Sequence, residues 1–157
     1  MYEQGLVEPF FSITLQRAAQ DAVTGPGGCL ALGGLPPVPY DPTFATVPVE
    51  IAPIPLNYTN SKQQISWWTV MVNAVAYGTN GISQNHVTTN STPFLALVDT
   101  GNWFNFLSGK VVDEVNNLFD PPAVLNSTAF PQTYSVDCSV KTPVFGIHIG
   151  GHMFYHN

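Results

Sequence analysis

A carboxylate, a hydroxyl and a glycine follow directly after a run of apolar residues in the segment LALVDTGN, residues 95–102. A buried strand that ends in Asp-Thr-Gly would present the carboxylate of Asp99 at a sharp turn, where it could exchange protons with a water or a substrate. An ordinary turn can begin in the same way, because an aspartate accepts hydrogen bonds from nearby backbone N–H groups. Catalysis would need a second carboxylate beside Asp99, so that the pair shares one proton and activates a water. The sequence contains no second Asp-Thr-Gly and no Asp-Ser-Gly.

Three histidines near the end of the chain, His148, His152 and His156, stand four residues apart. On a helix this spacing could hold a metal ion. The glycine pair at 150–151 instead predicts a β-hairpin with Ile149 opposite His152. In a hairpin the three side chains do not converge, so we expect no metal site. Motifs for a serine nucleophile, a phosphate-binding loop or a zinc protease are also missing, and we expect no cofactor.

The two cysteines, Cys29 and Cys138, are too few for a disulfide scaffold and lack metal-binding spacing. Two interpretations stay open for them. They could form an internal bridge, or they could remain free thiols. We favour free thiols, because Cys29 lies in the apolar run GGCLALGG, where cysteine usually acts as a small hydrophobic residue.

The elements that would position Asp99 are predicted to be strands. Short apolar or alternating runs recur between glycine, proline and asparagine residues, which is typical of an all-β protein. In residues 66–76 the alternation places Trp68 and every second residue after it on one face, which we expect to pack. The predicted strands cover residues 10–15, 29–32, 47–54, 66–76, 94–98 and 144–149.

One short helix is predicted over residues 109–119. Apolar residues such as Val111 and Val115 recur there at helical spacing, and Ser108 could cap the start. The proline pair at 121–122 then ends it.

Charged residues make up only 9% of the 157 residues, against about 25% in a typical protein. The length is sufficient for one domain with its own core. A net charge of −6 argues against binding nucleic acid or an anionic membrane surface, both of which attract clustered Lys and Arg. No run of 18 apolar residues exists, so a membrane-spanning helix is not expected.

Three Asn-x-Ser/Thr triplets begin at Asn57, Asn90 and Asn126, and all three are candidates for glycosylation. Together with the low charge they favour a secreted glycoprotein. The N-terminal sequence MYEQGLVEPF has neither a basic start nor a long apolar core, so it is not a signal peptide. We therefore expect that a preceding segment lies outside this chain.

Several segments taken together resemble the pepsin-like aspartic endopeptidases, and in particular the secreted fungal members. They occur in the order of that family from about residue 5 to residue 155. These segments are GLVEPFFSITL (5–15), GGCLALGGL (27–35), ISWWTVMVNAV (65–75), LALVDTGN (95–102), VVDEVNNLF (111–119) and YSVDCSVKTPVFGIHIGG (134–151).

The resemblance implies the pepsin-like acid protease fold, in which two β-rich lobes hold an extended peptide in the cleft between them. Residues 1–35 would form the end of the N-terminal lobe and the interlobe strand region. Residues 36–157 would form the C-terminal lobe, truncated at its C-terminal end. The last strands of that lobe, with an apolar-apolar-Gly motif and the usual partner of the cysteine matching Cys138, are expected outside the chain.

By the same resemblance, Asp99 is the catalytic aspartate of the second lobe. Thr100 would join the hydrogen bonds that connect the two catalytic loops, and Gly101 would allow the tight turn beside the catalytic water. Asn102 stands where Thr or Ser is usual, so an amide replaces a hydroxyl near the carboxylate. The implied mechanism is general acid–base hydrolysis, in which one ionised aspartate takes a proton from water while the other polarises the scissile carbonyl.

The first catalytic aspartate and the flap are expected before Met1, so we expect this chain alone to be inactive. The implied partners are an extended peptide or protein substrate and the missing N-terminal lobe, with no cofactor, and the implied location is extracellular. Two alternatives stay open. Two copies could pair to build a dyad from two Asp99 residues, or the chain could be a non-catalytic relative that binds peptides.

Overall fold

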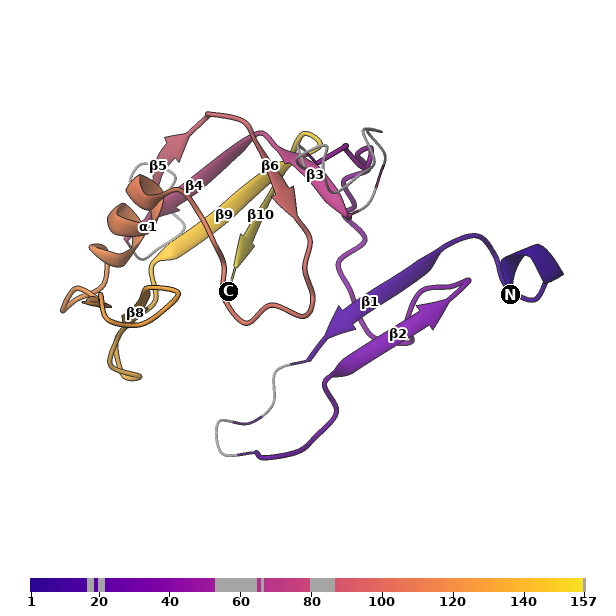
Figure 1. Cartoon of the computed structure of the whole chain (residues 1–157), viewed down its shortest axis with the longest axis horizontal. Coiled ribbons are helices and arrows are strands. Elements are labelled where there is room, and N and C mark those ends of the chain that lie inside the picture. Colours follow the sequence, from indigo (N-terminus) through magenta and orange to yellow (C-terminus); the bar gives the residue numbers. More distant parts are fainter. Residues whose placement is uncertain (17–18, 20–21, 53–64, 66, 80–86, 157) are drawn as a thin grey trace. The chain divides into compact units, whose positions relative to one another are not determined.

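A computed structural model describes residues 1–16, 19, 22–52, 65, 67–79 and 87–156. The chain divides into two compact units, Met1–Thr43 and Phe44–Asn157, which we call the first and second units. Strands dominate the described residues, together with one α-helix and one turn of 3-10 helix (Figure 1). The predicted all-β class is confirmed. The assignment of residues 1–35 to an N-terminal lobe stays a prediction.

The first unit contains the short 3-10 helix η1 (Tyr2–Gln4) and an antiparallel pair of strands, β1 (Phe11–Leu15) and β2 (Gly28–Leu32). Both strands were predicted, within one residue at their starts. At the end of the pair Leu15 lies opposite Gly28, whose φ is 138°. A Cβ on Gly28 would lie 1.9 Å from the carbonyl oxygen of Thr14, so only glycine fits there. One face of the pair carries large apolar side chains that are exposed: Phe11, Ile13, Leu15, Leu30 and Leu32.

The second unit is built on a four-stranded antiparallel sheet in the order β10 (His152–His156), β9 (Val144–Ile149), β4 (Ala74–Gly78) and β5 (Val87–Asn90), as Figure 1 shows. Strand β4 is buried along its whole length. The β9–β10 hairpin turns at two glycines with φ values of 56° and 83°, and Ile149 lies opposite His152. The predicted glycine hairpin and its register are confirmed.

Two further antiparallel pairs complete the second unit: β3 (Thr69–Val72) with β6 (Phe94–Leu97), and β7 (Val124–Asn126) with β8 (Thr133–Ser135). The single strand predicted over residues 66–76 is wrong, because the chain changes partners at Asn73. Strand β3 pairs with β6, the N–H of Asn73 then donates to the carbonyl of His148 at 2.8 Å, and β4 enters the four-stranded sheet. The expected alternation of burial is also not observed, because Thr69 is buried, Trp68 is half exposed, and both end residues of β3 are buried.

Helix α1 (Gly109–Asn116) packs Val111 into the core formed by Val72, Val75 and Tyr77. Ser108 occupies the N-cap position, as predicted, but its hydroxyl makes no capping bond. The helix ends three residues before the predicted boundary, because the N–H of Leu118 already bonds to the carbonyl of Val115 in a tighter turn.

The strand predicted over residues 47–54 is not formed in its described part, residues 47–52. Only Glu50 pairs there, as an isolated antiparallel bridge to Thr69. No helix within the described residues is both long enough and apolar enough to cross a membrane.

Candidate active site

The Asp-Thr-Gly segment begins where β6 ends. The β3–β6 pairing sets Thr69 opposite Leu97, and the N–H of Val98 extends it by donating to the carbonyl of Trp68 at 2.8 Å. Phe94 and Ala96, which alternate on β6, pack against the core of the second unit. The backbone that leads into Asp99 is therefore fixed by a ladder of hydrogen bonds and by apolar packing on one face.

Asp99 closes the following turn with its own side chain. Its Oδ1 accepts a hydrogen bond from the N–H of Gly101 at 2.9 Å, and its carbonyl accepts one from the N–H of Asn102 at 3.5 Å. Asp99, Thr100, Gly101 and Asn102 are all exposed. The carboxylate is thus held from one side and remains open to water or a ligand on the other.

Gly101 does not have a positive φ, so the turn does not depend on the conformational freedom of glycine. A Cβ on Gly101 would lie 3.4 Å from Asp99 Oδ1, at the short end of ordinary van der Waals contact. The contribution of Gly101 that this structure shows is the N–H that it donates to the carboxylate.

The other two residues of the predicted loop are less constrained. The Oδ1 of Asn102 accepts a hydrogen bond from the N–H of Phe104 at 3.3 Å, while the Thr100 hydroxyl has no partner within the described part of the chain. Large apolar side chains flank the turn and are exposed. They are Trp67, Trp68, Leu97, Val98, Trp103, Phe104 and Phe106.

The local geometry of Asp99 recurs at other exposed positions. Oδ1 of Asp41 accepts from the N–H of Thr43 at 2.8 Å, and Oδ1 of Asp137 accepts from the N–H of Ser139 at 2.8 Å. The Ser139 hydroxyl also donates to Asp137, and the two bonds hold the pKa of that carboxyl below its usual value. The turn at Asp99 is therefore a common one, and its geometry alone does not distinguish a catalytic aspartate from an ordinary turn residue.

The hairpin register separates the three histidines. His148 lies opposite Met153, so these two side chains share one face of the sheet. His152 and His156 lie on the opposite face, because they are an odd number of residues from Met153 on the same strand. Within the described residues no group of three potential ligands could hold a metal ion.

Both cysteines are free thiols, with Cys29 partly buried in the first unit and Cys138 exposed in the second. Of the glycosylation candidates, Asn90 and Asn126 end strands β5 and β7, and Asn57 lies outside the described residues.

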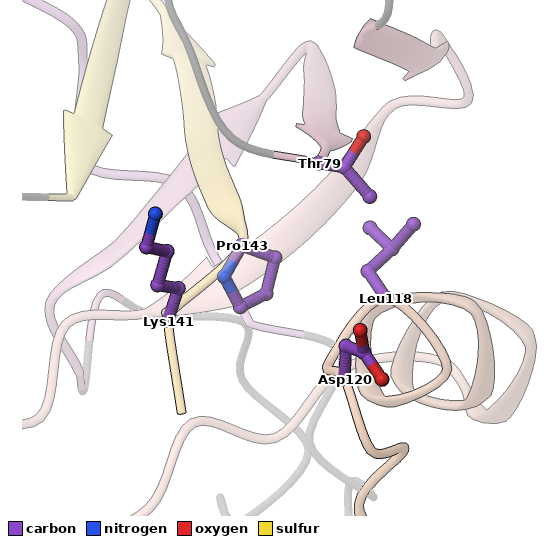
Figure 2. A pocket seen from close by; sticks show the side chains of 5 residues that line it. All are labelled: Thr79, Leu118, Asp120, Lys141 and Pro143. Carbon is purple, nitrogen blue, oxygen red and sulfur yellow. The ribbon is translucent and has the colours of Figure 1, made fainter. Parts of the chain in front are cut away.

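A pocket of about 330 Å³ lies in the second unit, lined by Thr79, Leu118, Asp120, Lys141 and Pro143 (Figure 2). In this view Thr79 and Leu118 point toward one another, whereas the Asp120 carboxylate and the Lys141 ammonium point in different directions. None of these residues belongs to the Asp-Thr-Gly segment. The pocket is therefore not the site that the sequence predicts.

A buried tyrosine that the sequence did not single out carries the largest electrostatic perturbation in the described residues. Tyr77, on β4, donates its phenolic hydrogen to Glu114 Oε2 on α1. This hydrogen bond, followed by burial and the charge of Glu114, raises the pKa of Tyr77 to about 12. One feature of the sequence could have indicated this contact. Glu114 lies on the same side of the helix as the core residues Val111 and Val115, where a carboxylate needs a hydrogen-bond donor.

Comparison with known proteins identifies the family of the chain. The family model for eukaryotic aspartyl proteases matches residues 1–156. The chain belongs to the eukaryotic aspartyl protease family. A probable aspartic-type endopeptidase of Aspergillus fumigatus is 34% identical to this family member over 157 residues, which are 100% of the chain and 33% of that relative. No solved structure matches the chain at a significant level.

Family membership and the observed strands confirm the predicted resemblance to pepsin-like proteases and the all-β, pepsin-like fold class. The chain spans about a third of the length of the Aspergillus relative.

Proposed function

We propose that this chain supplies one of the two catalytic aspartates, Asp99, of a secreted aspartic-type endopeptidase. The observation that carries the proposal is the position of the single Asp-Thr-Gly triplet at the exposed end of β6, in a chain that the aspartyl protease family model covers almost completely. The Gly101 N–H binds one oxygen of the carboxylate, and the turn is exposed, so the rest of the carboxylate is accessible to water. A group that activates water requires such access.

A pair of aspartates sharing one proton is the type case for this family. One ionised carboxylate takes a proton from the attacking water while its protonated partner donates a hydrogen bond to the scissile carbonyl. A lone carboxylate cannot hold both protonation states at once. Because the 157 residues contain one such triplet, Asp99 needs a second carboxylate from outside this chain.

Gly101 and Asn102 support the loop in this proposal, and Thr100 keeps its hydroxyl available for the catalytic loop of the other lobe. Gly101 donates its N–H to the carboxylate, and Asn102 accepts the N–H of Phe104 in the segment that follows. The exposed apolar side chains around the turn suit an extended peptide or protein substrate, whose side chains would cover them.

The test is complementation. The purified chain is assayed for hydrolysis of an unfolded protein at acid pH, alone and together with a family N-terminal lobe that carries the first Asp-Thr/Ser-Gly. We expect no turnover by the chain alone and turnover by the mixture. Asp99→Asn should abolish that turnover, and Asp137→Asn should not, because Asp137 has the same type of turn at an unrelated position.

Other outcomes identify the alternatives. Turnover by the chain alone that depends on Asp99 and rises with the square of the concentration would favour a homodimer with two Asp99 residues. Binding of a statin-type peptide inhibitor without turnover in any mixture would favour a non-catalytic peptide-binding relative. Turnover that survives Asp99→Asn would contradict the role proposed for this residue.

A further inference from the structure

The β7–β8 hairpin exposes apolar side chains on a protein with few charges. Val124 is 69% exposed, Leu125 is 44% exposed and Phe130 is fully exposed. Within the same hairpin, Asn126-Ser127-Thr128 forms an Asn-x-Thr triplet, and all three of its residues are exposed. A polar group attached here would shield the apolar residues from association with other molecules.

The side chains of this triplet form a compact hydrogen-bonded turn. Asn126 Oδ1 accepts the N–H of Thr128 at 3.3 Å and the hydroxyl of Thr128 at 2.9 Å. Both bonds use the amide oxygen, and within the described residues the amide nitrogen Nδ2 has no acceptor. The bonds span only two residues, so the turn can form in a nascent chain before the hairpin packs.

Asn90 provides a comparison within the same protein. Its Oδ1 also accepts the N–H of its threonine, Thr92, at 3.1 Å, but Asn90 is only partly exposed. In the β4–β5 register it lies opposite Val75, which is 2% exposed in the core, so both side chains lie on the core face of the sheet. Pro93 follows and restricts Thr92 to extended conformations. A sugar on Asn90 would have to leave from the packed face.

We propose that Asn126 carries an N-linked oligosaccharide and that Asn90 remains unmodified in most molecules. Asn126 Nδ2 would form the bond to C1 of the first sugar of a lipid-pyrophosphate-linked oligosaccharide. The bond from C1 to the pyrophosphate oxygen breaks, the lipid pyrophosphate leaves with the electron pair, and a base of the transferase takes the amide proton. The sugar would then lie on the face of β7 that carries the exposed Val124, which alternates with Asn126 on the side away from Leu125. The inference uses the secretory location contained in the proposed function, but not the proteolytic activity.

The test is translation of the full chain, behind a cleavable signal peptide, in the presence of endoplasmic reticulum membranes. Cleavage of the signal and protection from added protease report entry into the lumen. Peptide masses after endoglycosidase treatment report the occupancy of each asparagine. We expect the Asn126 peptide to be modified in the majority of the protected chains. Asn126→Gln and Thr128→Ala should abolish this modification, while Thr128→Ser and the matched variant Asn90→Gln should retain it.

A protected chain with an unmodified Asn126 peptide would overturn the proposal, as would occupancy at Asn90 equal to that at Asn126. If Asn126 were still modified in Thr128→Ala, the hydrogen bond from the Thr128 hydroxyl would not be needed for modification, which would contradict the proposed role of this contact. Solubility gives a second measurement, because the chain modified at Asn126 should stay in solution under conditions in which Asn126→Gln aggregates. Each readout is independent of peptide hydrolysis, so failure of the endopeptidase proposal would leave these results unchanged.

Discussion

Tyr77 and Glu114 join the most buried strand of the second unit to its only described α-helix. The phenolic oxygen of Tyr77, a residue that is 4% exposed, donates to Glu114 Oε2. On the solvent side, Glu114 Oε1 lies 3.8 Å from Lys110 Nζ in an exposed ion pair. The carboxylate of Glu114 thus lies at the boundary between the core and the surface. Water can replace the exposed ion pair more readily than the hydrogen bond from the buried Tyr77.

Removal of the Tyr77 hydroxyl is expected to destabilise the second unit. Tyr77→Phe keeps the ring in the core but leaves Glu114 without its buried donor, which should lower the free energy of unfolding by about 1.5–3 kcal/mol. Urea denaturation followed by tryptophan fluorescence measures the change. Tyr134→Phe is the matched control, because Tyr134 donates to Asp113 Oδ1 at 2.5 Å in an exposed position. If both variants lost the same free energy of unfolding, burial of the Tyr77 hydrogen bond would not explain its contribution to stability.

The same pair predicts a stability change at high pH. The pKa of Tyr77 rises from 10.0 to about 12 in the folded chain. Below pH 10 the phenol is protonated in both states and its contribution is complete, and it is lost as the pH rises through about 12, because the unfolded chain releases the proton first. Wild-type stability should therefore fall more steeply than that of Tyr77→Phe over this interval. Parallel slopes in a series of denaturation curves would argue against the shift.

The contact between Gly146 and Tyr155 is expected to exclude even a methyl group. A Cβ on Gly146 would lie 2.7 Å and 2.9 Å from Cδ1 and Cε1 of Tyr155. Gly146→Ala should force the ring off the sheet and cost about 1–3 kcal/mol, measured by thermal unfolding. Gly109→Ala is the matched control, because nothing lies within 4 Å of its Cβ position at the start of α1. It should be neutral or stabilising by up to about 1 kcal/mol, and a lower Tm there would contradict the comparison.

Thr69 buries a hydroxyl without a hydrogen-bond partner in the described part of the chain. The residue is 4% exposed. An unpaired buried hydroxyl costs about 1–3 kcal/mol, so the isosteric change Thr69→Val should leave stability unchanged or raise it. Thr69→Ser keeps the hydroxyl, removes a buried methyl group and should destabilise by about 1 kcal/mol. A larger loss in the valine variant than in the serine variant would reveal an ordered water or another partner for the hydroxyl.

Features encoded by short-range chemistry were predictable from the sequence. The glycine pair fixed the β9–β10 hairpin with its register, and the apolar spacing located α1. The strand predicted over residues 66–76 failed because the change of sheet at Asn73 depends on the carbonyl of His148, which is distant in sequence. Strands β5, β7 and β8 were missed, because their short segments have no apolar run and are ordered by the strands that pair with them.

The candidate site was predictable only in part, for a related reason. The triplet at residues 99–101 located Asp99, but the local geometry of Asp99 matches that of Asp137. The order of many segments along the chain is what singles out Asp99 as the predicted catalytic residue, because that order is a property of the family and not of the turn. Tyr77 was not identified, because the acceptor that raises its pKa lies 37 residues away on another element.

The hydrogen bonds between β3 and β6 continue as far as Val98, directly before Asp99. Hydrogen bonds hold the chain entering the Asp99 turn, whereas residues 102–108 leave it without regular secondary structure. If a second lobe binds at this turn, the backbone position of Asp99 is already fixed, and only the segment after the turn would have to adjust. A two-aspartate centre would then assemble by rigid docking onto Asp99, without simultaneous folding of both catalytic loops.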